Sequence, residues 1–214
     1  MRRRGRLITL EGGEGAGKST QARRLANALE ALGHNAVVTR EPGGSPGAED
    51  IRRLLVEGEP GRWDVLVETL MMFAARADHV AHTIAPALRS GAFVICDRFT
   101  DSTYAYQGAG RGLPRETIRR IEAIAIPDTK PDVTLILDLP PEAGLQRASA
   151  RAHGETRFER FDLAFHARLR EAFRDIARAH PERCALIDAS QPVDDVARAI
   201  WLAVEQRYGL AEKS

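Results

Sequence analysis

The sequence contains few cysteines, few aromatic residues and almost no net charge. Its 214 residues include only two cysteines, and 31 lysines and arginines are balanced by 30 aspartates and glutamates, which leaves a formal net charge of +1. Nucleic-acid binding needs a basic excess on one face, so we expect no nucleic-acid partner. Cys96 and Cys184 each lie in a short apolar segment. We expect two buried thiols without a disulfide, which favours a reducing, cytoplasmic setting.

Long apolar segments are also missing. No segment approaches the roughly 20 apolar residues that a membrane-spanning helix needs, so we expect no membrane partner. The basic residues 2–4 resemble the start of a signal peptide, but the apolar segment behind them, residues 7–10, is too short for one and runs into glycines. The length fits one sizeable domain with its own core, and we assign residues 1–214 to a single domain.

Strand-like and helix-like segments alternate along the chain. Short β-rich or apolar segments predict five strands, at residues 6–10, 36–39, 93–96, 133–137 and 184–187. Helical periodicity predicts helices at residues 19–32, 48–56, 64–89, 115–126 and 193–207, with a further arginine-rich helical stretch before the last strand. Pro86 is expected to end or kink the third of these helices. This alternation predicts an α/β, three-layer fold with a five-stranded parallel sheet flanked by helices.

Residues 12–19 match the phosphate-binding pattern G-x-x-x-x-G-K-[ST] in full. They follow a predicted strand and begin a predicted helix, which is where this P-loop pattern works. The glycines let backbone N–H groups surround a phosphate, and the helix N-terminus adds positive partial charge. Lys18 is suited to the β- and γ-phosphates, and the Ser19 hydroxyl to Mg²⁺. The predicted ATP-binding residues are Gly12, Gly13, Glu14, Gly15, Ala16, Gly17, Lys18, Ser19 and Thr20.

A P-loop alone does not distinguish a GTPase, an ATPase motor and a small-molecule kinase. The predicted strand at residues 93–96 ends in Asp97, an arrangement that would hold Mg²⁺ directly or through water, and Arg98 follows with a guanidinium suited to phosphate. Residues 129–132 resemble the base-reading motif of GTPases, but they precede a strand and so lie at the wrong end of the sheet. His79 and His82 lack a third ligand at a sensible spacing, so we predict no zinc site.

Residues 97–108, which read DRFTDSTYAYQG, closely resemble the thymidylate kinase signature DR[FYH]xxSxxAYQG. Further segments resemble the family in the same order, at residues 39–44, 73–79, 131–132, 138–142 and 187–192. The resemblance extends from residue 7 to residue 192, nearly the whole chain. It implies a P-loop nucleoside monophosphate kinase that transfers the γ-phosphoryl group of ATP to dTMP, giving dTDP and ADP for dTTP synthesis.

The resemblance also implies roles for individual residues. Phe73 and Arg76, three apart on one helix face, match the family's thymine-stacking and carbonyl-binding positions, although Phe73 taken alone is better explained by core packing. Arg52 and Arg98 match the positions that hold the dTMP phosphate. Tyr106 matches the aromatic residue under the deoxyribose. The full set implied for dTMP is Glu14, Arg52, Phe73, Arg76, Arg98, Ser102, Tyr106 and Gln107, with Glu14 near the sugar 3′-hydroxyl.

The family occurs in two types, which carry the catalytic arginine either in the P-loop or in a lid. The P-loop has no arginine here, whereas a small helical lid predicted at about residues 148–160 is rich in arginine. We therefore expect the lid-arginine type common in bacteria, with Lys18, Arg98, Arg151 and Arg157 as catalytic residues and Arg151 as the main transition-state contact. The acceptor phosphate is mostly dianionic at neutral pH, so no general base is required.

Two other functions remain open at this stage. A deoxynucleoside kinase acting on thymidine would need a carboxylate base, such as Glu14 or Glu41, and would leave two phosphate-binding arginines without a purpose. A P-loop regulatory ATPase would hydrolyse ATP without a nucleotide acceptor. The sequence does not distinguish dTMP from dUMP as the acceptor, because one methyl group changes the binding free energy only modestly. The resemblance implies a homodimer, with residues 64–89 as the candidate interface.

Overall fold

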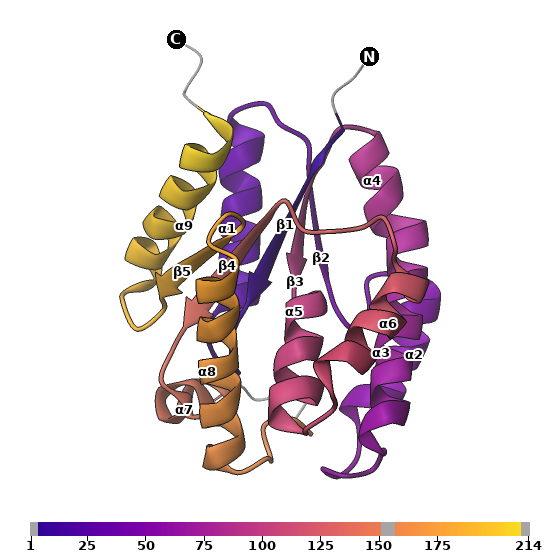
Figure 1. Cartoon of the computed structure of the whole chain (residues 1–214). Helices are drawn as coiled ribbons and strands as arrows, with labels where there is room; N and C mark the ends of the chain where they lie inside the picture. Colours follow the sequence, from indigo (N-terminus) through magenta and orange to yellow (C-terminus); the bar gives the residue numbers. More distant parts are fainter. Residues whose placement is uncertain (1–3, 151–156, 211–214) are drawn as a thin grey trace.

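The computed structural model describes residues 4–150 and 157–210 of the chain. Within these ranges the strands are β1 (Arg6–Glu11), β2 (Ala36–Arg40), β3 (Phe93–Asp97), β4 (Val133–Asp138) and β5 (Cys184–Asp188). They form one five-stranded sheet in the order β2-β3-β1-β4-β5, and all four pairings are parallel (Figure 1). The predicted five-stranded parallel sheet is therefore confirmed.

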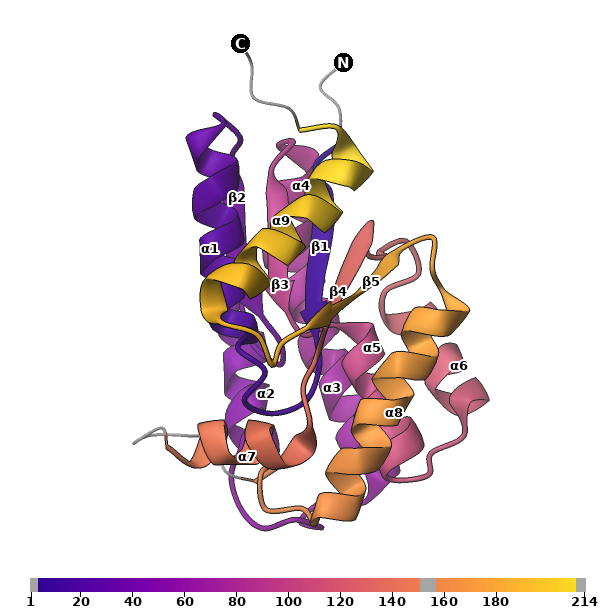
Figure 2. The same ribbon diagram turned by 90° about the vertical axis from the view of Figure 1, so that its left-hand side faces the viewer.

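Helices cover both faces of this sheet. The described helices are α1 (Lys18–Ala31), α2 (Pro46–Val56), α3 (Val65–His79), α4 (Ala85–Arg89), α5 (Thr100–Thr103), α6 (Arg115–Ala125), α7 (Pro141–Ser149), α8 (Leu163–Ala179) and α9 (Val193–Tyr208). Helices α1 and α9 lie on one face, and α4, α5 and α8 lie on the other (Figures 1 and 2). This is the three-layer arrangement that the alternation of elements predicts.

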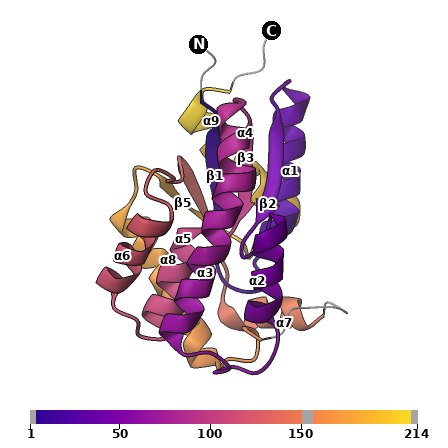
Figure 3. The same ribbon diagram turned by 90° about the vertical axis from the view of Figure 1, so that its right-hand side faces the viewer.

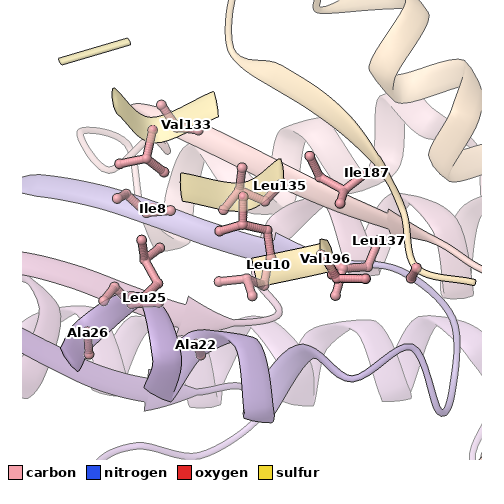
Figure 4. Packing of buried hydrophobic residues seen from close by; sticks show 14 of the residues in the cluster. Ile8, Leu10, Ala22, Leu25, Ala26, Val133, Leu135, Leu137, Ile187 and Val196 are labelled. Atoms are coloured by element: carbon pink, nitrogen blue, oxygen red, sulfur yellow. The ribbon is translucent and has the colours of Figure 1, made fainter. Parts of the chain in front are cut away.

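The core on the α1 and α9 side follows directly from the strand sequences. Side chains alternate along a strand, so Ile8 and Leu10 of β1 point to this face, where they meet Leu25 of α1 and Val196 of α9 (Figure 4). Leu7 points to the opposite face, among residues of α4. Because both faces of the central strands β1, β3 and β4 are buried, these strands appear in the sequence as nearly continuous apolar segments.

The segment predicted as one helix at residues 64–89 is helical throughout but changes its type. Helix α3 ends at His79, a π-helical turn covers Val80–Ile84, and α4 continues from Ala85. The Ala85 N–H bonds to the Val80 carbonyl, five residues back. Pro86 has no N–H to donate, and it lies in the first turn of α4, where helices tolerate proline. It therefore does not end the helical segment.

The glycine-containing segment after β3 was not predicted to be helical, yet it forms α5 and then a π-helical segment, Tyr104–Gly110. Its residues Ala105 and Tyr106 are buried in one hydrophobic cluster with Phe165, Leu169 and Phe173 of α8. This burial outweighs the low helix propensity of glycine. The central part of the predicted lid, residues 151–156, lies outside the described residues. Among the described helices, none is long and apolar enough to cross a membrane.

Candidate active site

The carboxyl ends of β1, β2 and β3 meet at one edge of the sheet. The register pairs Leu10 with Asp97 and Arg40 with Asp97, so the segments that follow these strands start side by side. In open parallel α/β sheets, ligands bind outside this edge. Two adjoining cavities lie here, and both are lined by Glu14, Glu41 and Arg98.

The P-loop connects β1 to α1 and lines the first cavity, which we call the P-loop cavity. Residues 14–20 all line it. The Lys18 ammonium group donates hydrogen bonds to the carbonyls of Gly13 (2.8 Å) and Gly12 (3.2 Å), which closes the loop around its own side chain. Burial, with the nearby Arg98 charge, lowers the pKa of Lys18 to about 8.

Two glycines of this loop are required by close backbone packing. Gly15 has a φ of 67°, and a Cβ there would lie 2.0 Å from the Gly144 carbonyl oxygen of α7. Gly12 has a φ of 133°, and a Cβ there would lie 2.4 Å from the Leu137 carbonyl oxygen of β4. At either position, any other residue would be strained both by the positive φ and by the close contact of its Cβ. The glycines therefore fix the loop against β4 and α7, in front of the α1 N-terminus.

The predicted metal ligands lie together beside the loop. The Ser19 hydroxyl on α1 donates a hydrogen bond to the carboxylate of Asp97 at the end of β3, and both residues line the P-loop cavity. A hydroxyl and a carboxylate are hard oxygen donors of the kind that Mg²⁺ prefers, particularly next to a phosphate site. The chemistry of these donors and their shared cavity therefore fit Mg²⁺.

Arg98 lies between the two cavities and lines both. Its φ of 72° is unusual for a residue with a side chain. The guanidinium donates to the Gly12 carbonyl (2.9 Å), to the Ser102 hydroxyl (3.2 Å) and to the carboxylate of Glu14 (2.9 Å). It also lies 4.9 Å from the centre of the Tyr106 ring. The strained backbone and these bonds direct a fixed cation toward the space between the cavities.

The second cavity, which we call the acceptor pocket, contains most of the residues predicted for dTMP. Those that line it are Glu14, Arg52, Arg76, Arg98, Ser102, Tyr106 and Gln107. The Tyr106 hydroxyl donates to Glu14 (2.7 Å), and burial raises the pKa of Tyr106 well above its ordinary value, so the hydroxyl keeps its proton. The Ser102 hydroxyl donates to the buried carboxyl group of Glu11 (2.6 Å). The sequence thus brings together residues from four separate segments.

Phe73 is not brought to this pocket. Its side chain is buried in α3, and the Arg76 guanidinium lies 4.8 Å from the centre of its ring. The spacing of three residues correctly put Phe73 and Arg76 on one side of the helix, but Phe73 lies behind the arginine. Phe73 thus packs against Arg76 and does not itself line the acceptor pocket.

Arg76 is held by a buried set of polar groups. Its Nε donates to Glu41 (2.6 Å), and its two terminal nitrogens donate to the Thr103 hydroxyl and to the Phe99 carbonyl, both at 3.1 Å. The other oxygen of Glu41 lies 2.9 Å from Nδ1 of His79. Glu41, His79 and Cys96 are close enough together to suggest a metal cluster, but the Arg76 guanidinium already neutralises Glu41. The cluster therefore orients Arg76 at the pocket wall.

The two predicted lid arginines have different outcomes. Arg151 lies outside the described residues. Arg157 is described and fully buried, and it forms an ion pair with Glu68 (2.5 Å) and hydrogen bonds with two backbone carbonyls. It does not line the P-loop cavity. The structure does not bring Arg157 to the reacting groups, because its side chain is completely buried and lines neither cavity.

Several lining residues were not among the predicted site residues. Arg147, in the last turn of α7, lines the P-loop cavity and donates to the Ala189 carbonyl (3.0 Å). Met72 and Phe158 line the acceptor pocket. The arginine density of residues 147–160 was a signal for Arg147. Met72 lies one turn before Arg76 on α3, so helical spacing could have indicated it, whereas nothing in the sequence marks Phe158.

The comparisons with known proteins agree with this geometry. The thymidylate kinase family profile matches residues 10–200. The thymidylate kinase of Caulobacter vibrioides is 57% identical over 206 residues, covering 96% of this chain and 99% of the relative. The thymidylate kinase of Nitrobacter hamburgensis is 50% identical over 213 residues, covering 99% and 93%. The crystal structure of thymidylate kinase from Ehrlichia chaffeensis superposes with a TM-score of 0.77 at 34% identity, covering 94% of this chain and 98% of that one. The chain therefore belongs to the thymidylate kinase family.

Proposed function

We propose that this enzyme transfers the γ-phosphoryl group of ATP to dTMP, giving dTDP and ADP. The observation that carries the proposal is the position of Arg98, a fixed cation shared by the P-loop cavity and the acceptor pocket. A kinase of this type must bring two polyanions together and neutralise the charge that spreads over the transferred group. Arg98 would contact both phosphate groups, a role supported by its lining of both cavities.

The donor side is formed by the P-loop. Lys18 and the backbone N–H groups at the start of α1 would bind the β- and γ-phosphates of ATP. Ser19 and Asp97 would hold Mg²⁺, which when bound neutralises charge on the phosphate oxygens. Because Lys18 and Arg98 are already fixed by hydrogen bonds to Gly12, little reorganisation is needed when the phosphates arrive.

On the acceptor side, Arg52 and Arg98 would bind the dTMP phosphate, and Tyr106 would pack under the deoxyribose. Arg76 presents its guanidinium at the pocket wall, where a base carbonyl can accept from it. Arg151 stays our proposed transition-state contact from a lid at about residues 148–160, within a single domain. We do not extend that role to Arg157.

The structure gives a reason to prefer a monophosphate acceptor over thymidine. A thymidine hydroxyl needs a general base whose pKa is near the operating pH. Burial alone would raise the pKa of Glu14, but the charges of Arg98 and Lys18 and the Tyr106 hydroxyl outweigh burial and lower it to about 2. Glu41 is engaged by Arg76 and His79. Neither carboxylate is suited to remove a proton, and a phosphate dianion needs no such base.

The test is ADP release from ATP with dTMP, dUMP, thymidine, CMP or AMP, and with no acceptor. We expect the highest kcat/KM with dTMP, and Lys18→Met should abolish turnover with every acceptor. Equal rates with thymidine would support the deoxynucleoside kinase instead. ADP release without any acceptor would support a regulatory ATPase. An Arg151→Ala variant should lower kcat far more than it weakens dTMP binding.

We also propose a homodimer formed through α3. Leu66, Val67 and Leu70 are 42%, 42% and 48% exposed, and their spacing puts them on one face of the helix. Figure 3 shows α3 along this side of the molecule, between α2 and α6. A Leu70→Glu variant should elute as a monomer in light-scattering chromatography, whereas an unchanged mass would exclude this face. A cytoplasmic location is supported by the need for ATP and dTMP.

A further inference from the structure

A second buried charge cluster lies next to the acceptor pocket. Glu68 on α3 and Arg157, in the turn before α8, are both completely buried, and their Oε2 and Nη2 atoms lie 2.5 Å apart. They are 89 positions apart in the sequence. Burying such a pair is costly unless its geometry is good and its remaining polar atoms are satisfied.

Each side chain of the pair is hydrogen-bonded to a segment that contributes to the wall of the acceptor pocket. Arg157 Nη1 donates to the carbonyl of Leu55 (2.8 Å), and the next residue, Val56, lines the pocket. The other oxygen of Glu68 accepts from Gln107 Nε2 (2.9 Å), and Gln107 also lines the pocket. The pair thus connects wall residues that come from α2 and from the π-helical segment after α5.

The residue after Arg157 completes the same wall. Phe158 lines the pocket, and the Arg157 guanidinium lies 5.1 Å from the centre of its ring. The Phe158 ring makes an edge contact with Tyr106 (5.5 Å), whose hydroxyl bonds to Glu14. Fixing Arg157 therefore fixes Phe158 against the aromatic residue that faces the acceptor sugar.

We propose that Arg157 is a positioning residue for the acceptor: its buried ion pair with Glu68 fixes Phe158, Val56 and Gln107 as one preformed wall of the pocket. The inference rests on the proposed function, since it concerns the same acceptor site. Arginine suits the task because its planar fork donates in several fixed directions, whereas lysine offers a single ammonium group. Here the fork also reaches the Glu59 carbonyl (3.2 Å), in the connection from α2 to α3.

A plain hydrophobic contact could stabilise this interior as well as the ion pair does. It would not set the direction of three neighbouring segments. The inference therefore predicts an effect on acceptor binding that exceeds the effect on folding. It also separates Arg157 from the catalytic arginines, since a transition-state contact would act on kcat while leaving acceptor binding unchanged.

The experiment compares Arg157→Met and Arg157→Lys with the parent enzyme. Steady-state kinetics give kcat and the KM values for dTMP and ATP, and calorimetry gives the dissociation constant for dTMP. Thermal unfolding identifies any variant that does not fold. Arg160→Met is the matched control, because Arg160 lies in the same turn and its ion pair with Glu59 is exposed (49% and 76%).

We expect Arg157→Met to raise the KM and the dissociation constant for dTMP about tenfold, a change equivalent to losing one well-made contact. The KM of Arg157→Met for ATP should stay within about twofold of the parent. The KM of Arg157→Lys for dTMP should fall between the values of the parent and of Arg157→Met. Arg160→Met should behave as the parent. If Arg157→Met does not fold, Arg157→Lys alone must show the selective rise in the KM for dTMP.

A double variant tests the route through Phe158. If Arg157 acts by fixing that ring, Arg157→Met should add little to the weakening of dTMP binding already caused by Phe158→Ala, because the two effects are then not additive. Unchanged dTMP binding with a lower kcat would instead assign Arg157 to catalysis, and a lower melting temperature alone would make it purely structural. Either result overturns the inference. Failure of the parent enzyme to phosphorylate dTMP would refute the proposed function separately.

Discussion

The charge of Glu14 is controlled by its neighbours more strongly than its position in a glycine-rich loop suggests. Its carboxylate accepts from Arg98 (2.9 Å) and from the Tyr106 hydroxyl (2.7 Å), with Lys18 nearby. Burial favours the neutral form, but these groups outweigh burial and lower the pKa to about 2. A Glu14→Gln variant keeps the shape of the side chain and removes its charge, so it tests this interpretation.

The magnitude follows from the difference between the unfolded and folded pKa values. The pKa of an ordinary glutamate is 4.5, whereas the pKa of Glu14 in the folded enzyme is about 2. At about 1.4 kcal/mol for each pH unit, the ionised carboxylate contributes about 3 kcal/mol to the free energy of unfolding. Because the folded pKa is depressed, this contribution is complete above pH 4.5 and is lost as the pH falls toward 2. The glutamine variant lacks it at every pH.

The assay is urea unfolding of the parent and Glu14→Gln at pH 7, 5, 4 and 3, without nucleotide. We expect the parent to be more stable by about 3 kcal/mol at pH 7, and the difference to shrink steadily toward pH 3. Glu57→Gln, which removes an exposed carboxylate, should give a small difference with no such trend. A difference between parent and Glu14→Gln that is the same at pH 7 and pH 3 would refute the reasoning.

Three further predictions follow from the same edge of the sheet. Asp97→Asn should raise the Mg²⁺ concentration for half-maximal activity by at least about tenfold, measured by titration at saturating ATP and dTMP. Tyr106→Phe keeps the ring but removes the hydrogen bond to Glu14, so urea unfolding at pH 7 should show a loss of about 1.5–3 kcal/mol. Burial raises the pKa of Glu11 to about 8. The parent should therefore lose stability as the pH rises from 4.5 to 8, because the buried carboxyl group ionises over this range. The melting temperature of Glu11→Gln, which has no such group, should change less between these pH values.

Much of this fold could be predicted from sequence because its signals are local. Residues 12–19 form a phosphate-binding loop through glycines and a lysine that are close in sequence, and β3 (Phe93–Asp97) is apolar because both of its faces are buried. The approach of Ser19 to Asp97 then follows because the loops after parallel strands lie at the same carboxyl edge of the sheet. These parts of the site needed no knowledge of long-range contacts.

The contacts that could not be predicted are those that depend on direction and distant partners. Spacing placed Phe73 and Arg76 on one side of α3, but it could not show which of the two reaches the pocket. The density of arginines around residue 157 indicated a lid, yet the partner of Arg157 is Glu68, on a helix 89 positions earlier. A buried arginine and a catalytic arginine look the same in a sequence, because the difference lies entirely in what surrounds the guanidinium.

The surroundings of these arginines point to one arrangement. Arg98 is paired with Glu14, Arg76 with Glu41, and Arg157 with Glu68, so each of these three guanidinium groups has a carboxylate partner. Such pairing fixes each side chain during folding, and the binding of substrate then needs little further ordering. The pairing also cancels positive charge, and a site that binds two polyanions needs positive charge. The pairing therefore fixes the geometry of these arginines, and we propose that Lys18, Mg²⁺ and Arg151 supply the further positive charge that the phosphates need.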